Sequence, residues 1–360
     1  MMMRRMSLEL SVLDQSPISE GMTVGDALRN TIDLACLADR LGFARYWVAE
    51  HHGTAMLAGT SPEILIGPIA AATTRLRVGS GGVMLPHYSP LKVAETFNLL
   101  NALYPGRIDL AVGRAAGTDS LTAFALQRDR RHAPPDDFPE QLAELLAYVR
   151  DGFPAEHPLA RLVPSPSKNL ANPSNLSSSS NLSNPSNLPN PAPEPWLLGS
   201  SPQSGIWAAE LGLPYAFADF IYPGGAAVAR RYRESFVPSR IQSSPRVIVA
   251  AWALCADTAE EAESLAASSR MAFARFLSGD PIRVPRVETA LDFLDRHPDS
   301  LGAVMRRRRA IIGTPSSVRD RLESLAIEYG ADEVMIVTIT FEHARRRRSY
   351  ELLSEAFTGR

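Results

Sequence analysis

The chain has 360 residues, enough for one large α/β barrel or for two ordinary domains. Hydrophobic residues make up 45% of it and charged residues 21%, a globular composition that allows a sizeable core. The 37 Lys and Arg residues nearly balance the 39 Asp and Glu residues, and the net charge of -2 argues against electrostatic capture of nucleic acid or of an anionic membrane.

Cysteine content and the N-terminal residues bear on where the protein works. Cys36 and Cys255, the two cysteines, both lie in apolar runs and are typical of small buried hydrophobes in a reducing compartment. The two arginines near the N-terminus are followed by no apolar stretch that could form the core of a signal peptide. No window approaches the roughly 20 apolar residues of a membrane helix, so we expect a cytoplasmic protein without membrane contact.

The first half of the chain alternates apolar strand patterns with helix patterns. Ser61-Pro62 and Ser89-Pro90 each place a capping hydroxyl before a proline at the first helical position, and Gly42 is suited to end the preceding helix. The expected strands are 8–14, 43–49, 76–85 and 107–113. The expected helices run from about 23 to 41, 62 to 74, 89 to 103 and 139 to 150.

A low-complexity segment then interrupts the alternation. From about Leu162 to Pro195 the chain repeats Asn-Pro-Ser-Asn-Leu, with four serines from Ser177 to Ser180 between copies. It has almost nothing to bury, so its composition predicts a disordered surface insertion over 162–195 within a single barrel domain that spans 1–360. Loop expansions of this kind are tolerated at small entropic cost, and we assign this one no function.

The alternation resumes after the insertion. The expected strands are 196–199, 214–220, 246–255 and 333–338, and the expected helices are about 206–211, 224–236, 259–277, 314–329 and 343–357. The charged stretch from about 279 to 309 has no clear period, and we expect it to be irregular. Two runs of four arginines, 306–309 and 345–348, are typical of solvated faces or partner contacts.

Eight apolar strands, nearly all followed by a helix, predict a parallel sheet. Eight such units predict an α/β fold of the closed (β/α)8 or TIM barrel type, with insertions. The rival is an open, doubly wound sheet. No Gly-x-Gly-x-x-Gly turn follows the first strand, which disfavours the dinucleotide-binding form of that rival.

The strand at 43–49 ends abruptly in Glu50-His51-His52. Neighbouring strand side chains point to opposite faces, so packing explains two adjacent histidines poorly. We expect one imidazole to face a cavity and the other to brace it, at the barrel end where active sites lie. A zinc site is disfavoured because the two side chains diverge and no third ligand follows at a useful spacing.

Two further strand ends could bind an anion. Arg114 follows the fourth strand among small residues, and Ser200, Ser201 and Ser204 follow the fifth strand at the start of a helix. Free N–H groups and the helix dipole make such a helix start a good phosphate site. A surface salt bridge at Arg114 and ordinary helix capping by one serine are the alternative interpretations. On the third strand, glycines 79, 81 and 82 are unusual in a strand interior, and a flat ligand against the main chain would explain them.

Taken together, these motifs resemble those of the bacterial luciferase-like flavin monooxygenases. The resemblance covers nearly the whole chain, except the Asn/Pro/Ser-rich insertion and residues 279–309. Each motif alone is weak, but four in the right order on the right β-α loops are specific for the superfamily. The residues that carry it are Ala49-Glu50-His51-His52, Val78-Gly79-Ser80-Gly81-Gly82-Val83-Met84-Leu85-Pro86, Gly106-Arg107 leading into Gly113-Arg114, and Gly199-Ser200-Ser201-Pro202-Gln203-Ser204 with Ala208 to Pro214.

The resemblance implies a barrel that binds reduced FMN at its carboxyl end and lets O2 form a 4a-hydroperoxyflavin. By motif, His51 matches a histidine with an acid/base role, and Arg114 matches an arginine that binds the FMN phosphate. Ser201 and Ser204 match phosphate-contacting positions, and we add Ser200 from the same turn. Gly81-Gly82 matches a pair joined by a cis peptide beside the flavin ring. Gly113 stands where the luciferase α subunit has a reactive cysteine, so thiol chemistry is not implied.

We therefore expect an FMN-dependent monooxygenase that oxidises a small organic substrate, with His51 and His52 as the catalytic residues. The alternatives are that His51 is a hydrogen-bonded histidine that caps the barrel mouth, and that His52 supports His51 or is purely structural. A separate reductase would supply reduced FMN, because no nicotinamide fingerprint is present. The resemblance also implies a homodimer. No metal is expected. The alternatives are a deazaflavin-dependent hydride-transfer enzyme on the same barrel and a non-catalytic flavin-binding protein.

Overall fold

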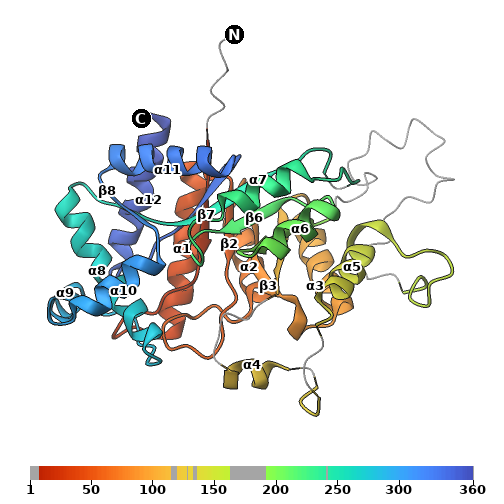
Figure 1. Ribbon diagram of the computed structural model, residues 1–360, viewed down its shortest axis with the longest axis horizontal. Coiled ribbons are helices and arrows are strands. Elements are labelled where there is room, and N and C mark those ends of the chain that lie inside the picture. The colour runs from red at the N-terminus through yellow and green to blue at the C-terminus, as the bar shows by residue number, and fades with distance from the viewer. Residues whose placement is uncertain are drawn as a thin grey trace, which may run out of the picture.

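The computed structural model describes residues 8–114, 120–127, 129–132, 136–162, 192–240 and 242–359. Eight parallel strands close into a barrel, in the order β6-β5-β4-β3-β2-β1-β9-β7, and pairing of β6 with β7 completes the circle (Figure 1). The predicted (β/α)8 barrel is confirmed. The strands are β1 (Glu9–Asp14), β2 (Arg45–Val48), β3 (Arg77–Met84), β4 (Ile108–Gly113), β5 (Glu194–Gly199), β6 (Tyr215–Ala218), β7 (Val247–Cys255) and β9 (Glu333–Val337).

Helices surround the barrel, and several begin and end at the signals visible in the sequence. Thr23 and Asp26 form a reciprocal capping box at the start of α1, and Gly42 ends that helix with a φ of 83°. Pro62 and Pro90 stand in the first turns of α2 and α3. The helices around the barrel are α1 (Val24–Leu41), α2 (Pro62–Ala72), α3 (Pro90–Leu103), α5 (Phe138–Leu146), α6 (Pro202–Glu210), α7 (Ala226–Glu234), α8 (Ala259–Leu277), α11 (Pro315–Tyr329) and α12 (His343–Thr358).

The prediction that residues 279–309 are irregular is wrong. They contain α9 (Val287–Arg296) and α10 (Pro298–Arg307), which pack with α8 on one side of the barrel (Figure 1). A ninth strand, β8 (Ala310–Gly313), pairs with the second half of β7 outside the closed circle. Helix α9 buries Ala290 and Leu294, and its apolar residues at 287, 290, 291 and 294 follow a helical spacing that the sequence analysis missed. The short helix α4 (Ser120–Leu126), which buries no residue, was also not predicted.

The Asn/Pro/Ser-rich segment falls mostly on residues 163–191, which lie outside the described residues. Strand β5 begins at Glu194, so the last two residues of the expected 162–195 insertion belong to the barrel. The Glu194 carboxylate lies 2.9 Å from Nη2 of Arg77 on β3. This ion pair explains why a charged residue begins an otherwise apolar strand.

Alternation along the strands separates two apolar layers. On β2, Trp47 points into the barrel and meets Trp196 of β5 edge-on at 5.5 Å, whereas Tyr46 and Val48 point outward to the helices. Alanines such as Ala111 share the interior with the two tryptophans. The interior is therefore a packed core and not a pore.

Charged side chains fill the barrel at the amino ends of its strands. The buried guanidinium of Arg45 lies 2.7 Å from Asp109 and 3.1 Å from Glu333, and Arg246 lies 3.2 Å from Glu333. The indole N–H of Trp47 also donates to Asp109 at 2.9 Å. This network occupies the interior of the amino end, so the polar residues at the carboxyl ends of the strands mark the end available to a ligand.

Glycine at position 79 is required by close packing between β3 and β4. A Cβ at Gly79 would lie 2.6 Å from both Cβ and the carbonyl oxygen of Asp109. Gly79→Ala is therefore expected to lower the free energy of unfolding by about 1–3 kcal/mol, measured by urea denaturation. Gly25→Ala is the matched control, because its Cβ would meet nothing closer than 3.4 Å, and it should leave stability equal or slightly higher. Equal stability of the two variants would contradict this packing argument.

Candidate active site

A buried carboxylate organises the carboxyl end of β2. Glu50 is 2% exposed and accepts three hydrogen bonds. Oε1 accepts from Nε2 of His52 and from the Tyr88 hydroxyl, both at 2.8 Å, and Oε2 accepts from the backbone N–H of Met84 at 2.9 Å. Burial and the nearby Glu50 raise the pKa of Tyr88, so its phenol stays protonated and continues to donate. Glu50 thus ties the end of β2 to the end of β3 and the turn after it.

His51 differs from its neighbour His52. The His51 backbone N–H donates to the carbonyl of Gly59 at 2.8 Å, but the imidazole Nδ1 is buried with no hydrogen-bond partner among the described residues. Burial, with a smaller contribution from His52, lowers the pKa of His51 to about 4. The imidazole is therefore neutral near pH 7 and keeps a ring nitrogen available for a ligand.

Acidification is expected to cost the wild type more stability than a His51→Gln variant. Because the folded pKa is about 4 and the ordinary value is 6.5, the unfolded chain binds an extra proton between these pH values. Stability is therefore lost as the pH falls from about 6.5 toward 4, and the part due to His51 at pH 5 is about 2 kcal/mol. Urea denaturation of both proteins at about pH 7.5 and pH 5 measures this loss of stability. Equal losses in the two proteins would show that His51 is not buried in its neutral form.

The glycine pair of β3 is joined by a cis peptide bond, Gly81–Gly82, as the sequence resemblance implied. The pairing of β3 with β4 shifts register at this point. A Cβ at Gly82 would lie 2.9 Å from the carbonyl oxygen of Ala111, and a Cβ at Gly81 would collide with Leu13. Protein atoms alone thus account for glycine here, without the flat ligand invoked from sequence, and flavin contact at Gly81 and Gly82 stays a prediction.

Arg114 follows β4 with half of its side chain exposed. Its nearest acidic partner in the described part of the chain is Asp136, at a long 3.8 Å, and Asp136 is itself exposed. The Arg114 guanidinium carbon lies 5.8 Å from the ring centroid of Trp207, on α6. The structure therefore brings Arg114 close to the helix that the serine turn begins.

The three serines of that turn differ in what they can bind. Ser201 is exposed and caps α6, its Oγ accepting from the N–H of Ser204 at 3.3 Å. The buried Ser204 hydroxyl donates to the carbonyl of Ser201 at 2.7 Å and lies 2.9 Å from the Tyr215 hydroxyl, so its one proton is already used. Ser200 and Ser201 are thus better placed than Ser204 to meet an anion.

The sequence analysis did not name Glu50 among the functional residues. The signal was present, since a carboxylate directly before two histidines at a strand end is expensive to bury unless it is hydrogen-bonded. The sequence does not show that the Tyr88 hydroxyl and the Met84 backbone N–H donate hydrogen bonds to this same carboxylate, because these contacts depend on the path of the chain at the end of β3.

Comparison with known proteins identifies the family. The family model for luciferase-like monooxygenases matches residues 6–333, most of the chain. The chain belongs to the luciferase-like monooxygenase family. It is 37% identical to a luciferase-like monooxygenase of Escherichia coli over 96% of each chain. It is also 37% identical to the N-acetyl-S-alkylcysteine monooxygenase of Bacillus subtilis, over 97% of this chain and 98% of that protein. The crystal structure of apo-MsnO8 is 39% identical, with a TM-score of 0.83 over 98% of both chains.

More distant structures share the fold alone. One is the oxygenating constituent of 3,6-diketocamphane monooxygenase from Pseudomonas putida, in complex with FMN, at 19% identity and a TM-score of 0.68 over 99% of both chains. Another is an F420-dependent secondary alcohol dehydrogenase at 14% identity and a TM-score of 0.59, over 97% of this chain and 99% of that one.

Family membership makes this luciferase-like monooxygenase a flavin-dependent oxidoreductase, with a small molecule and O2 as the class of substrates. Within the described residues, no helix is both long and apolar enough to span a membrane.

Proposed function

We propose that this protein is an FMN-dependent monooxygenase that uses reduced FMN and O2 to oxidise a small organic substrate. The observation that carries the proposal is the position of Arg114. A half-exposed guanidinium, whose nearest acidic partner among the described residues is 3.8 Å away, lies near Trp207 of α6, the helix that the serine turn begins. Both lie at the same end of the barrel as His51, the end where active sites of this fold are found.

The residues present fit the phosphate of a flavin mononucleotide. A guanidinium binds phosphate oxygens in a bidentate manner. Ser200 and Ser201 add hydroxyl groups, and the start of α6 adds free N–H groups and the positive end of its dipole. A deazaflavin coenzyme also carries phosphate, so this site alone does not choose between the two cofactors.

His51 fits a role in handling protons. Reduced FMN, when bound, supplies the electrons for oxygen activation. The neutral imidazole of His51 can accept or return a proton at Nδ1, the nitrogen that has no hydrogen-bond partner within the described part of the protein. His52 is held by Glu50 and acts in support, fixing the loop that carries His51.

The apolar interior next to the site supports oxygen chemistry. Trp47, Trp196 and Leu13 are completely buried in the barrel, and the amino end is filled by the Arg45 network. These packed side chains fill the barrel between its amino end and the site, and exclusion of water protects reactive intermediates from side reactions.

The main alternative is hydride transfer with a deazaflavin, since the fold is shared with an F420-dependent dehydrogenase. The other is a flavin-binding protein without catalysis. Family membership, with two monooxygenases among the relatives at 37% identity, favours the oxygenase. A homodimer and a separate reductase stay proposals that rest on the sequence resemblance.

Oxygen consumption tests the proposal. The protein is mixed with FMN, NADH and an added flavin reductase, and O2 uptake is compared with that of the reductase and FMN alone. We expect the protein to change the rate of O2 uptake with FMN and to have no such effect with a reduced deazaflavin. Activity that appears only with the deazaflavin, or no effect with either cofactor, would overturn the proposal.

A further inference from the structure

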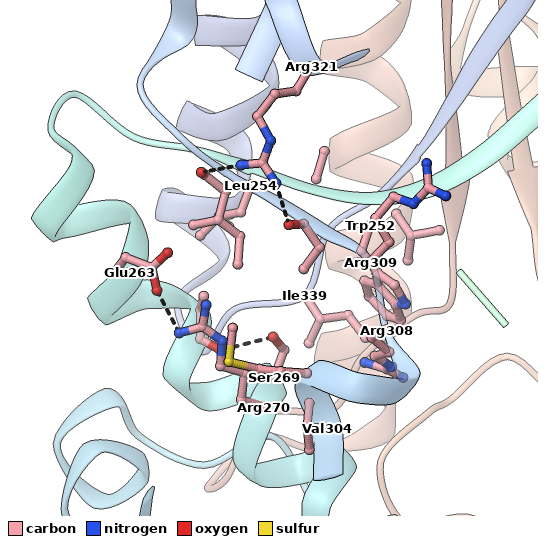
Figure 2. Close-up of a pocket in the computed structure, with 16 residues that line it drawn as sticks. Trp252, Leu254, Glu263, Ser269, Arg270, Val304, Arg308, Arg309, Arg321 and Ile339 are labelled. Carbon is pink, nitrogen blue, oxygen red and sulfur yellow. Dashed lines mark hydrogen bonds and ion pairs between the residues drawn. The ribbon is translucent and has the colours of Figure 1, made fainter. Parts of the chain in front are cut away.

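A cavity of about 300 Å3 lies at the carboxyl ends of β7 and β9, between these strands and helices α8 and α10 (Figure 2). Trp252, Val337 and Ile339 line it and also belong to the apolar cluster inside the barrel. In the order of strands around the barrel, β7 and β9 stand opposite β3 and β4. The cavity thus lies on the side of the barrel opposite β3, which carries the glycine pair, and β4, which leads to Arg114.

Four arginines reach this cavity, and three of them have partners. Arg270 lies 2.7 Å from Glu263, and Arg309 lies 2.6 Å from Glu328. Arg321 donates to two backbone carbonyls at the start and middle of β8, at 3.0 and 3.1 Å. Figure 2 shows the contacts of Arg270 and Arg321 as dashed lines. These three side chains are explained by the protein itself.

Arg308 is different. Its Nε is buried with no hydrogen-bond partner, and no acidic group pairs with its guanidinium among the described residues. The guanidinium stacks between two rings, with its carbon 4.2 Å from the ring centroid of Trp252 and 3.3 Å from that of Phe273. Burial alone lowers the pKa of Arg308 to about 9, so the side chain is still charged at neutral pH.

Arg308 is half-buried, and a buried N–H donor of a charged group is costly unless it is hydrogen-bonded. Contact with the aromatic rings holds the guanidinium but leaves the buried Nε–H without an acceptor among the described residues. The orientation that the rings impose on Arg308 therefore favours a planar acceptor, which a carboxylate provides.

We propose that Arg308 binds the carboxylate of a small monoanionic substrate, whose apolar part lies against Trp252 and Ile339. The proposal rests on the proposed function and names the substrate class of that site. One unpaired cation in the described lining balances one negative charge, which favours a monocarboxylate over a phosphate dianion. The volume and the apolar walls fit a short aliphatic chain.

Isothermal titration of the full chain with hexanoate and with hexanol tests the inference. Hexanoate should bind, and hexanol should bind at least about tenfold more weakly, because it lacks the charge-assisted hydrogen bonds. Arg308→Met should weaken hexanoate binding by about tenfold or more and leave hexanol unaffected. Arg307→Met, an exposed neighbour in the same arginine run, is the matched control and should bind hexanoate like the wild type.

Melting temperature separates binding from a purely structural role. Arg308→Met removes a half-buried guanidinium whose buried Nε–H has no acceptor among the described residues, so its melting temperature should equal or exceed that of the wild type. A lower melting temperature together with unchanged hexanoate affinity would show that Arg308 only packs on the two rings and would overturn the inference. Failure of hexanoate to bind the wild type would do the same. Flavin affinity, measured separately on the same variants, distinguishes this failure from failure of the proposed function.

Discussion

Arg45→Met is expected to lower the free energy of unfolding by about 3–5 kcal/mol. The Arg45 guanidinium is the shared partner of two fully buried carboxylates, at 2.7 Å from Asp109 and 3.1 Å from Glu333. Burial raises the pKa of Glu333 even with this arginine beside it, so the carboxylate depends on its cationic partners to stay charged. Methionine keeps the length of the side chain but leaves both acids without that charge.

Urea denaturation measures the effect, with Arg29→Met as the matched control. Arg29 also pairs with an aspartate at 2.7 Å, but its side chain is 72% exposed. An exposed pair contributes about 0–1 kcal/mol, so this control should be nearly as stable as the wild type. If the two variants were equally stable, the ion pairs of Arg45 at the amino end would contribute no more to stability than an exposed ion pair does.

Arg114→Ala is expected to weaken FMN binding by about 10- to 100-fold, the range for a lost charge-assisted contact. Riboflavin provides an internal control, because it has the same ring system without the phosphate. The wild type should bind FMN more tightly than riboflavin, and the variant should bind the two alike. Quenching of flavin fluorescence on titration gives all four dissociation constants.

A second control is Arg40→Ala, which removes an exposed arginine from the last turn of α1. Helices run back along the barrel against the strands, so Arg40 lies at the opposite end from Arg114. It should leave both affinities unchanged. Equal loss of FMN and riboflavin affinity in Arg114→Ala would place the arginine beside the ring or in the fold, and not at the phosphate.

The barrel itself was predictable because its signals are local. Continuous apolar runs, serine–proline helix starts and glycine helix ends each depend on a few neighbouring residues, and eight such units in order leave few folds. Strand β8 and helices α9 and α10 were not predicted from the sequence. Packing against β7 and α8 stabilises them. On α9, however, the apolar residues at 287, 290, 291 and 294 recur at helical spacing, so this helix could have been predicted from the sequence.

The two arginine runs show that composition does not predict which arginines are buried. Both were expected on solvated faces or at partner contacts, yet Arg346 is buried and its Nη2 donates to Asp14 of β1 at 2.6 Å. Arg308 stacks between two rings at the cavity. Each of these arginines has the same residue type as its neighbours, and only the fold places Arg346 in the interior and the buried Nε of Arg308 at the cavity.

The sequence predicted that the residues of the candidate site lie at strand ends, but it did not predict which contacts each of them makes. His51 and His52 are adjacent, and the structure alone shows that Glu50 holds His52 while Nδ1 of His51 has no partner in the described part of the chain. In the same way, the sequence grouped Ser201 with Ser204, whose hydroxyl contacts Tyr215. Such differences depend on side chains that meet from separate strands.

Anaerobic titration of the purified protein with reduced FMN tests the central claim most directly, since binding of that cofactor at the barrel mouth underlies the proposed function. We predict saturable binding of reduced FMN, with a weaker affinity in Arg114→Ala. Absence of affinity for FMN in both its reduced and its oxidised state would contradict the claim.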